Sequence, residues 1–414
     1  MNVKRLLGLC LAIVAIAASM TLSTASAQVQ PAIINPTCAF PIIVNQNDAN
    51  IAYPDTNSTY WAMPTNFALG DVVRITGEFA YARYMSFNSY DSTGSSVGGL
   101  RDVAMLPDSG SVNPFQAGQS LTGSPRNYTV GVNVTTTPQL SSPVQGEIDA
   151  IPGPAWLLIR VYVPFDPTSP SGSVPLPSMS VNGVVKPGCT TFGSEPAITA
   201  LAALIMGQAI ADAIPPAEVP EFSFSGGGGL FPNADNKYVY ATTAWEPGRV
   251  ILVRGLAPSF PNTPTQALYP EQQLRYWSMC TNLLVTPAPV VECARDSETM
   301  LGPDGYYLYV ISAEADRPSD ASIAREHGTF LKWFGPIGEA LPNELKPNGN
   351  LILRNMLPES SFTNAVQNIP VTQSNAAART TMGQYYPEAT YCQRSVFERF
   401  GAAACFVLGP SYTG

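Results

Sequence analysis

Residues 70–77 read Gly-Asp-Val-Val-Arg-Ile-Thr-Gly, and residues 248–255 read Gly-Arg-Val-Ile-Leu-Val-Arg-Gly. Each stretch is a run rich in β-branched residues with a glycine at both ends, which is typical of a short β-strand. The two stretches have the same length. They are the first indication that the chain contains one β-rich domain twice.

Other stretches match in the same order along the chain. They are Ala52–Thr56 with Trp61 against Tyr240–Thr243 with Trp245, Arg83–Ser86 against Arg275–Ser278, Arg101-Asp102 against Arg295-Asp296, Tyr128–Val132 against Tyr307–Ile311, and Leu157–Arg160 against Leu351–Arg354. Arg101 lies 59 residues before Arg160. Arg295 lies 59 residues before Arg354. Matches in one order with equal spacing predict an internal duplication, and each copy has an ordinary domain size.

The composition indicates that these domains are built from strands and turns. The sequence has 39 Pro and 33 Gly, and its apolar runs are short and rich in Val, Ile, Tyr and Thr. The fold class is therefore mainly β, with two tandem related β-sandwich or jelly-roll-like domains joined by a helical segment. We expect a first β domain at 28–190, a helix and Gly-rich linker at 191–232, a second β domain at 233–372 and a C-terminal extension at 373–414.

The first 27 residues predict a cleaved signal peptide. Lys4 and Arg5 precede an apolar stretch, and Ala25-Ser26-Ala27 is a small-residue cleavage site. We therefore expect a secreted, periplasmic or cell-envelope protein. The formal charge of −9, which becomes −11 without Lys4 and Arg5, argues against nucleic acid as a partner. An apolar segment at 197–214 is long enough to suggest a membrane span, but Gln208 and Asp212 favour burial between domains, so no integral span is expected in the mature chain.

Six cysteines follow the predicted cleavage site, and an even number in an exported chain predicts disulfide bonds. Their positions favour the pairs Cys38–Cys189, Cys280–Cys293 and Cys392–Cys405. The last pair lies within the predicted C-terminal extension. In the repeat alignment Cys280 matches Asn88 and Cys293 matches Gly99, so the second copy would staple a hairpin that the first leaves open. The chain has one histidine and no C-x-x-C pair, so we expect no metal and no cofactor.

Around residues 50–91 the chain resembles bacterial exported proteins of the domain-of-unknown-function 1214 type, which often occurs with domain 1254. The residues that carry the resemblance are Asp55-Thr56, Trp61, Arg83-Tyr84-Met85-Ser86 and Asp91. The second copy keeps Trp245 and Arg275-Tyr276-Trp277-Ser278 but lacks the Asp-Thr pair. The resemblance implies a β-sandwich protein of the cell envelope, and it implies no reaction.

The repeated polar and aromatic residues are the candidate ligand-binding residues. Arg101 and Arg295 each pair with a carboxylate of their own domain, such as Asp91 or Asp108, or they belong to a polar site for sugar or calcium. The tryptophans form either core or an aromatic platform for a glycan. The candidates are Asp55, Trp61, Arg83, Tyr84, Arg101, Asp102, Trp245, Arg275, Tyr276, Arg295 and Asp296.

No residue is assigned a catalytic role. Gly94–Gly98 fits the G-x-S-x-G pattern of serine hydrolases, which requires a strand before the serine and a helix after it. Here the next predicted strand follows instead, and His327 lies in the other copy. We therefore predict that Ser96 belongs to a hairpin turn and that His327 caps or ends a helical turn.

These observations favour an exported binding or structural protein without enzymatic activity, whose unknown ligand would be a glycan or an apolar molecule. The alternative is an extracellular hydrolase of a polymer or ester that uses paired carboxylates. Two carboxylates facing each other across an open cleft would favour the hydrolase. A closed, apolar-filled sandwich would favour binding or structure.

Overall fold

A computed structural model describes residues 36–192, 219–224, 231–264, 272–371 and 375–408. These residues belong to one compact unit, Ile33–Gly414. The predicted signal peptide, the apolar segment at 197–214 and most of the Gly-rich linker lie outside the described residues.

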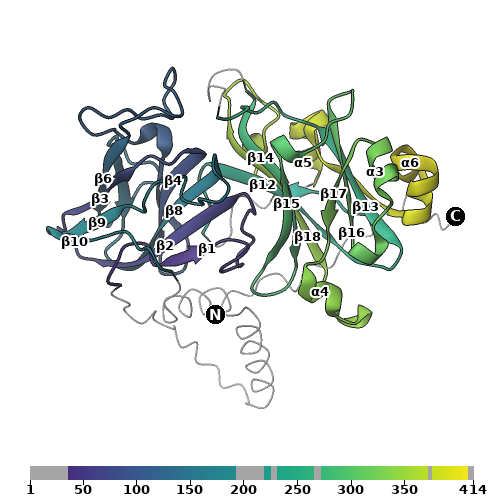
Figure 1. The fold of residues 1–414 in the computed structure, drawn as a ribbon, viewed down its shortest axis with the longest axis horizontal. Helices are drawn as coiled ribbons and strands as arrows, with labels where there is room; N and C mark the ends of the chain where they lie inside the picture. The colour runs from purple at the N-terminus through teal and green to yellow at the C-terminus, as the bar shows by residue number, and fades with distance from the viewer. Residues whose placement is uncertain (1–35, 193–218, 225–230, 265–271, 372–374, 409–414) are drawn as a thin grey trace, which may run out of the picture. The chain divides into compact units, whose positions relative to one another are not determined.

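The first half of the described chain, residues 36–192, forms two five-stranded sheets and is called repeat 1 below (Figure 1). One sheet has the order β1 (Ile42–Val44), β2 (Ser58–Phe67), β8 (Gly153–Pro164), β4 (Ala82–Asp91), β5 (Ser96–Arg101). The other has the order β10 (Val184–Lys186), β9 (Ser178–Val181), β3 (Val73–Glu78), β6 (Asn127–Val134), β7 (Glu147–Ala150). Apolar side chains from both sheets, such as Met85, Ile75 and Ile159, form one buried core. The sheets therefore pack as a sandwich.

The second half, called repeat 2, is also a sandwich of two sheets. One has the order β11 (Ser223–Phe224), β12 (Asn236–Thr243), β18 (Gly349–Pro358), β14 (Leu274–Leu283), β15 (Val290–Arg295). The other has the order β17 (Gly328–Lys332), β16 (Tyr306–Ser312), β13 (Arg249–Leu256), β19 (Glu388–Gln393). Its core includes Trp277, Tyr309 and Leu353. The predicted fold class, mainly β with related sandwiches, is confirmed.

The two repeats share strand order, strand direction and register. In both, the central strand of the first sheet, β8 or β18, lies between the equivalents of β2 and β4. Both second sheets contain one parallel pair, β6 with β7 and β16 with β17. Ser86 lies opposite Arg101 and Arg160. Ser278 lies opposite Arg295 and Arg354 in the same way, so the arginines aligned in the sequence occupy equivalent positions.

One part of the sequence alignment was wrong. The stretch around Asp55 does not correspond to Tyr240–Thr243. On the central strands, Tyr60 lies opposite Arg160 and Tyr238 lies opposite Arg354. Trp245 is therefore equivalent to Phe67 rather than to Trp61, and Asp55 is equivalent to Asn233. Short aromatic and threonine-rich runs look alike in sequence, and only strand pairing fixes their register.

A glycine explains why the opening stretches recur. Gly77 lies opposite Tyr128, and Gly255 lies opposite Tyr307. A Cβ atom at Gly77 would lie 2.9 Å from the Tyr128 hydroxyl, and one at Gly255 would lie closer still to the Tyr307 hydroxyl. Each tyrosine ring therefore covers the backbone of a strand that carries no side chain at that point.

In the part of the chain that the structure describes, the helices are mostly in repeat 2. They are α3 (Asp320–Arg325), α4 (Pro336–Ala340), α5 (Asn375–Met382) and α6 (Arg394–Leu408), and the short 3₁₀ helices are η1 (Asp102–Ala104), η2 (Asp296–Glu298), η3 (Glu314–Asp316), η4 (Asn343–Leu345), η5 (Val366–Asn368) and η6 (Gly383–Tyr385). Ser319 caps α3. His327, at φ 51°, ends the turn after α3 as predicted, and β17 follows. β19 pairs with β13, so the sandwich also continues beyond residue 372.

The three predicted disulfides, Cys38–Cys189, Cys280–Cys293 and Cys392–Cys405, are all present. The Cα atoms of Cys280 and Cys293 are 4.0 Å apart on one hairpin, slightly closer than the roughly 4.4–6.8 Å usual for disulfides.

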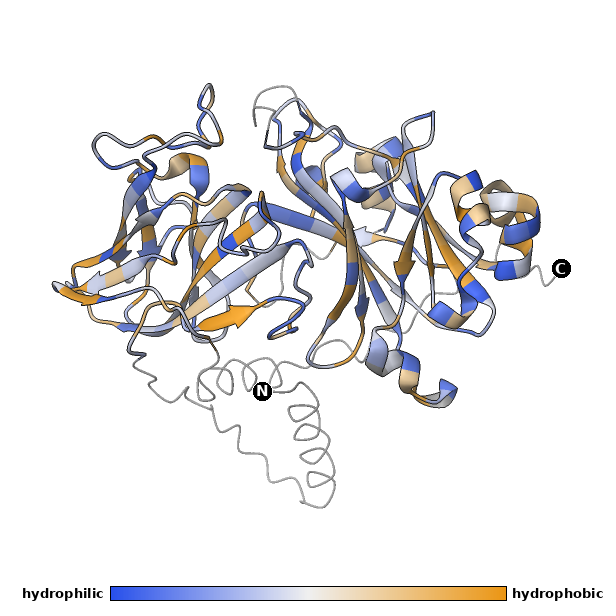
Figure 2. Ribbon diagram, in the orientation of Figure 1, coloured by the Kyte–Doolittle hydropathy of each residue, from blue (hydrophilic) through white to orange (hydrophobic). Residues whose placement is uncertain are grey.

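Strands carry much of the apolar sequence, and β1 is hydrophobic along its whole length (Figure 2). Among the described residues, no helix has the length and apolar character needed to cross a membrane.

Candidate functional site

Most of the candidate residues are buried where repeat 1 meets repeat 2. Asp55, Asp102, Tyr84 and Tyr276 are fully buried, and the buried members of the set include Arg83, Arg275 and Asp296. Trp61 is buried in a different place, in the core of repeat 1. Trp245 follows β12 and is half-buried, and its ring packs near Phe334. The structure thus brings together the polar candidates and separates the two tryptophans.

Two buried ion pairs connect the repeats, and they are reciprocal. Arg83 of repeat 1 places Nη1 at 2.7 and 2.6 Å from the two carboxylate oxygens of Asp296 in repeat 2. Arg275 of repeat 2 places Nη1 at 2.8 Å from both oxygens of Asp102 in repeat 1. Each repeat therefore contributes the same arginine and the same aspartate to its neighbour, which is the chemistry of a two-fold symmetric interface.

The local structure of each repeat positions these aspartates. Asp102 begins η1 directly after β5, and its carboxylate accepts hydrogen bonds from the N–H groups of Met85 and Val103. Asp296 begins η2 after β15 and accepts equivalent bonds from Trp277 and Ser297. Burial raises the pKa of both carboxyls, and the arginine from the other repeat opposes this shift.

Tyrosine hydroxyls make a second reciprocal contact. Tyr276 donates to Asp55 at 2.7 Å, and Tyr84 donates to Asp235 at 2.8 Å. Asp55 also accepts from Ser278 at 2.7 Å. Burial raises the pKa of both tyrosines well above their usual value, so both remain protonated donors at neutral pH.

Two arginines complete the interface by holding backbone of the other repeat. Arg160 donates to the carbonyl of Phe231 at 2.7 Å. Arg354 donates to the carbonyl of Tyr53 at 2.7 Å. Tyr53 and Phe231 have φ angles of 53° and 52°, in the left-handed region that side chains with a Cβ seldom adopt. The segments before β2 and β12 thus both reach across to the opposite repeat, with nearly the same φ at Tyr53 and Phe231.

Arg101 and Arg295, the first residues of the two Arg-Asp pairs, behave differently from each other. The sequence predicts that each pairs within its own domain with a residue such as Asp91 or Asp108. Arg101 instead pairs with Asp235 of repeat 2 at 3.1 Å. Arg295 does stay in its own repeat, where it pairs with Glu298 at 3.0 Å. Repeat 2 offers Arg295 the nearby Glu298, whereas the equivalent residue of repeat 1 is Ala104, which has no carboxylate.

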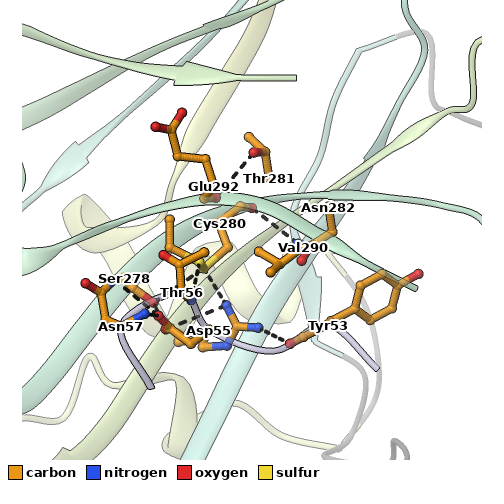
Figure 3. The surroundings of a disulfide bond; sticks show 12 residues. Tyr53, Asp55, Thr56, Asn57, Ser278, Cys280, Thr281, Asn282, Val290 and Glu292 are labelled. Carbon is orange, nitrogen blue, oxygen red and sulfur yellow. Dashed lines mark hydrogen bonds and ion pairs between the residues drawn. A yellow bond between two sulfur atoms is a disulfide. The ribbon is translucent and has the colours of Figure 1, made fainter. Parts of the chain in front are cut away.

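The Cys280–Cys293 disulfide lies at the same interface (Figure 3). Arg354 places Nη1 at 2.7 Å from the Cys280 sulfur, and the N–H of Thr56 lies 3.4 Å from the Cys293 sulfur. An oxygen of Asp55 and the two sulfurs all lie within 4.8 Å of one another. The bonded sulfurs are not thiolates and so are not metal ligands in this state, which agrees with the buried Arg354 beside them.

The serine-hydrolase pattern, Gly94–Gly98, runs from the turn after β4 into β5, so Ser96 is the first residue of a strand rather than part of the turn predicted for it. Asp91 ends β4, Ser96 begins β5, and β5 is followed by the three-residue η1 rather than by a helix of the kind that the pattern requires. The Ser96 hydroxyl lies 3.4 Å from the Pro232 carbonyl, to which it donates. His327 follows α3 in repeat 2, where its N–H donates to Ala324. The geometry of this segment is that of a hairpin.

These contacts hold the two sandwiches together. They also occupy the buried carboxylates with hydrogen bonds and ion pairs inside the protein. Asp55, Asp102, Asp235 and Asp296 each accept hydrogen bonds or ion pairs from the opposite repeat. Asp235 and the two arginines of the central strands were missed as site residues. The sequence did carry a signal for Arg160 and Arg354, because both recur at equal spacing, but it held none for Asp235.

Comparison with known proteins gives no family. No family model and no curated protein matches the chain. Among solved structures, the chain is similar to an uncharacterised protein from Burkholderia cenocepacia, with a TM-score of 0.49, 9% identity, and coverage of 84% of this chain and 80% of that one. It is also similar to the VPA0106 protein from Vibrio parahaemolyticus, with a TM-score of 0.39, 11% identity, and coverage of 82% and 90%. At these scores the similarities carry no argument about function.

Proposed function

We propose that this chain is exported through a cleaved signal peptide and acts, without catalysis, as a binding or structural protein of the cell envelope or extracellular space. The resemblance to domain-of-unknown-function 1214 proteins is part of this proposal. The ligand would be a glycan or an apolar molecule.

One observation carries the location. All six cysteines that follow residue 27 are paired in three disulfides. Structural disulfides persist in oxidising compartments and are rare in the cytosol. The basic, apolar and small-residue parts of residues 1–27 provide a route to such a compartment.

Closed cores and engaged carboxylates support a role without catalysis. Both sandwiches are filled with apolar side chains. A paired-carboxylate hydrolase needs two acids that face a substrate. In the described part of the chain, the carboxylates of the interface face arginines, tyrosines and backbone N–H groups of the protein itself.

Expression of the full chain in a Gram-negative host tests export. We expect the accumulated protein to begin at Gln28, to lie outside the cytoplasm and to react with no thiol reagent until it is reduced. A matched variant without residues 2–27 should stay in the cytoplasm with reactive thiols. Protein that begins at Met1 and carries free thiols in the cytoplasm would contradict the proposal.

A fluorophosphonate probe and glycan affinity gels test the role. We expect no labelling at Ser96, because its hydroxyl has no base partner among the described residues. Among the candidate residues, Arg101 is exposed and Trp245 and Arg295 are partly exposed, so these three remain for ligand contact. Substitution of Trp245 by Ala should weaken retardation by a bound polysaccharide, while labelling at Ser96 would support the hydrolase alternative.

A further inference from the structure

The two repeats complete the same interface in two chemically different ways. In repeat 1, Arg160 contacts the side-chain oxygen of Asn88, which lies opposite Gly99 on the β4–β5 hairpin. In repeat 2, the equivalent Arg354 contacts the sulfur of Cys280, which lies opposite Cys293 on the β14–β15 hairpin. The Cys280 sulfur therefore takes the place of the Asn88 amide oxygen, and a disulfide bond joins the two strands of the repeat 2 hairpin.

The stapled hairpin of repeat 2 holds residues 50–57 of repeat 1, which we call the docking segment. The N–H groups of Ala52 and Tyr53 donate to Pro287 and Ala288 at 2.9 and 2.7 Å. Asn50 exchanges two hydrogen bonds of 2.8 Å with the backbone of Val290. The partners of the docking segment lie in or next to the loop between β14 and β15. The shape of that hairpin therefore decides whether the docking segment fits.

The sulfurs themselves touch the docking segment and its anchor. Thr56 lies against Cys293, and Arg354 bridges Cys280 to the carbonyl of Tyr53. Figure 3 shows Tyr53, Asp55 and Thr56 beside the disulfide. Cys280 has no exposed surface and Cys293 has 7%. Two thiols need more room than one S–S bond of about 2 Å, and in this packed site the room must come from Thr56 or Arg354.

We propose that the Cys280–Cys293 disulfide is a redox-sensitive control of the contact between the repeats, and that its reduction releases the docking segment from repeat 2. A dithiol reductant supplies two electrons and two protons. The S–S bond breaks, both cysteines become thiols, and the reductant leaves as its own disulfide. Arg354 then loses its fixed sulfur contact, and the hairpin loses the staple that shapes the loop. This goes beyond the proposed function, because the coupling is a property of the fold in any compartment.

Repeat 1 supplies a matched control. The variant Cys280→Asn/Cys293→Gly gives repeat 2 the pair that repeat 1 uses at the same positions, so it should keep the interface and lose the response to reductant. The variant Cys280→Ser/Cys293→Ser represents the reduced state and should lose the contacts of the docking segment with repeat 2. Both variants keep the disulfides Cys38–Cys189 and Cys392–Cys405, so any response that they show to reductant belongs to those bonds.

Amide hydrogen exchange of the full chain measures how well each backbone N–H is protected from solvent. Reduction of the wild type, verified by alkylation of Cys280 and Cys293, should speed exchange at Ala52 and Tyr53 by about tenfold or more. The serine variant should show the same increase without reductant. The N–H of Phe231, which donates to Gly94 at the equivalent contact of repeat 1, should not change.

The outcome that overturns the proposal is equally direct. If the serine variant protects Ala52 and Tyr53 as well as the wild type does, the disulfide does not control the docking segment. If the serine variant does not fold, the wild type with alkylated Cys280 and Cys293 decides the question, because unchanged exchange at Ala52 refutes the proposal. Neither result depends on export or on any ligand.

Discussion

Repeat 1 and repeat 2 have the same sheet order, yet they close the same hairpin differently. Repeat 1 places Asn88 opposite Gly99, and repeat 2 places Cys280 opposite Cys293. The polar interface around these pairs is nevertheless nearly the same on both sides. The comparison teaches that the contact between the repeats is the shared feature of the duplication, and that the staple is a variation within it.

The outer edges of the second sheets differ as well. In repeat 2, α6 packs on the edge strand β19 and is tied to it by Cys392–Cys405. In repeat 1, the hairpin strand β10 forms the edge, and Val184 and Val185 are 69% and 63% exposed. Repeat 1 is instead tied near this edge by Cys38–Cys189, which joins the two ends of its sequence. The same fold is therefore closed over a long range in one repeat and locally in the other.

The largest expected effect comes from this difference in closure. Cys38 and Cys189 are 151 residues apart, whereas Cys392 and Cys405 are 13 apart. From the entropy of loop closure, we expect the free energy of unfolding to fall by roughly 5 kcal/mol in Cys38→Ala/Cys189→Ala and by roughly 3 kcal/mol in Cys392→Ala/Cys405→Ala. Urea unfolding measures both. A larger loss for the short-range pair would show that packing of α6, and not loop closure, dominates.

Removal of a buried arginine tests the shared feature. Arg83→Met leaves Asp296 buried without its cation, which should lower the free energy of unfolding by about 3–5 kcal/mol. Arg275→Met should cost nearly the same, because its contacts to Asp102 match. Arg295→Met is the control, since the pair with Glu298 is partly exposed and should contribute no more than about 1 kcal/mol. Unequal losses for Arg83 and Arg275 would break the equivalence of the repeats.

Much of the fold could be predicted from sequence because it depends on local signals. Glycine-bounded β-branched runs gave the strands, and even spacing of the arginines gave the duplication. The three disulfides followed from pairing the six cysteines in their order along the chain. The register around Trp245 failed, because strand pairing is a long-range property that short aromatic runs do not specify.

The sequence predicted which residue types form the candidate site, but it did not predict which residues pair with each other. Arg83 and Asp102 recur together in each copy, and nothing in the spacing says that each arginine pairs with the aspartate of the other copy. Asp235 was missed for a related reason. Repeat 1 places the carboxylate at Asp55 and an amide at Asn57, whereas repeat 2 places an amide at Asn233 and the carboxylate at Asp235, so the motif does not read as repeated.

A smaller effect tests the tyrosine that covers a glycine in each repeat. Gly255→Ala places a Cβ against the Tyr307 hydroxyl and should cost about 1–3 kcal/mol of stability by overpacking. Tyr307→Phe removes the clashing oxygen and should restore part of the loss in the double variant. Gly77→Ala with Tyr128→Phe is the equivalent pair in repeat 1, where rescue should be smaller because Pro177 Cβ also lies 2.8 Å from the new Cβ. If the phenylalanine gives no rescue at Gly255, the clash lies with the Tyr307 ring carbon Cζ or the Tyr386 backbone, which are also close.

The smallest expected effect concerns pH. Burial raises the native pKa of Asp102 and Asp296 above the 3.8 expected in the unfolded chain, so the native state binds protons more readily. Their contribution to stability is then fully present below the unfolded pKa and is lost as pH rises through the native pKa. Relative to Asp102→Asn/Asp296→Asn, the wild type should lose unfolding free energy as pH rises from the unfolded pKa of 3.8 through the native pKa. A gain over this range would reverse the sign.

The reciprocal pairing itself is tested most directly by double-mutant cycles in urea unfolding. One cycle combines Arg83→Met with Asp296→Asn across the repeats, and the other combines Arg83→Met with Asp102→Asn within repeat 1. We expect a coupling free energy of roughly 1–3 kcal/mol for Arg83 with Asp296 and additivity within about 0.5 kcal/mol for Arg83 with Asp102. Strong coupling of Arg83 to Asp102, with none to Asp296, would contradict the exchange of partners between the two repeats.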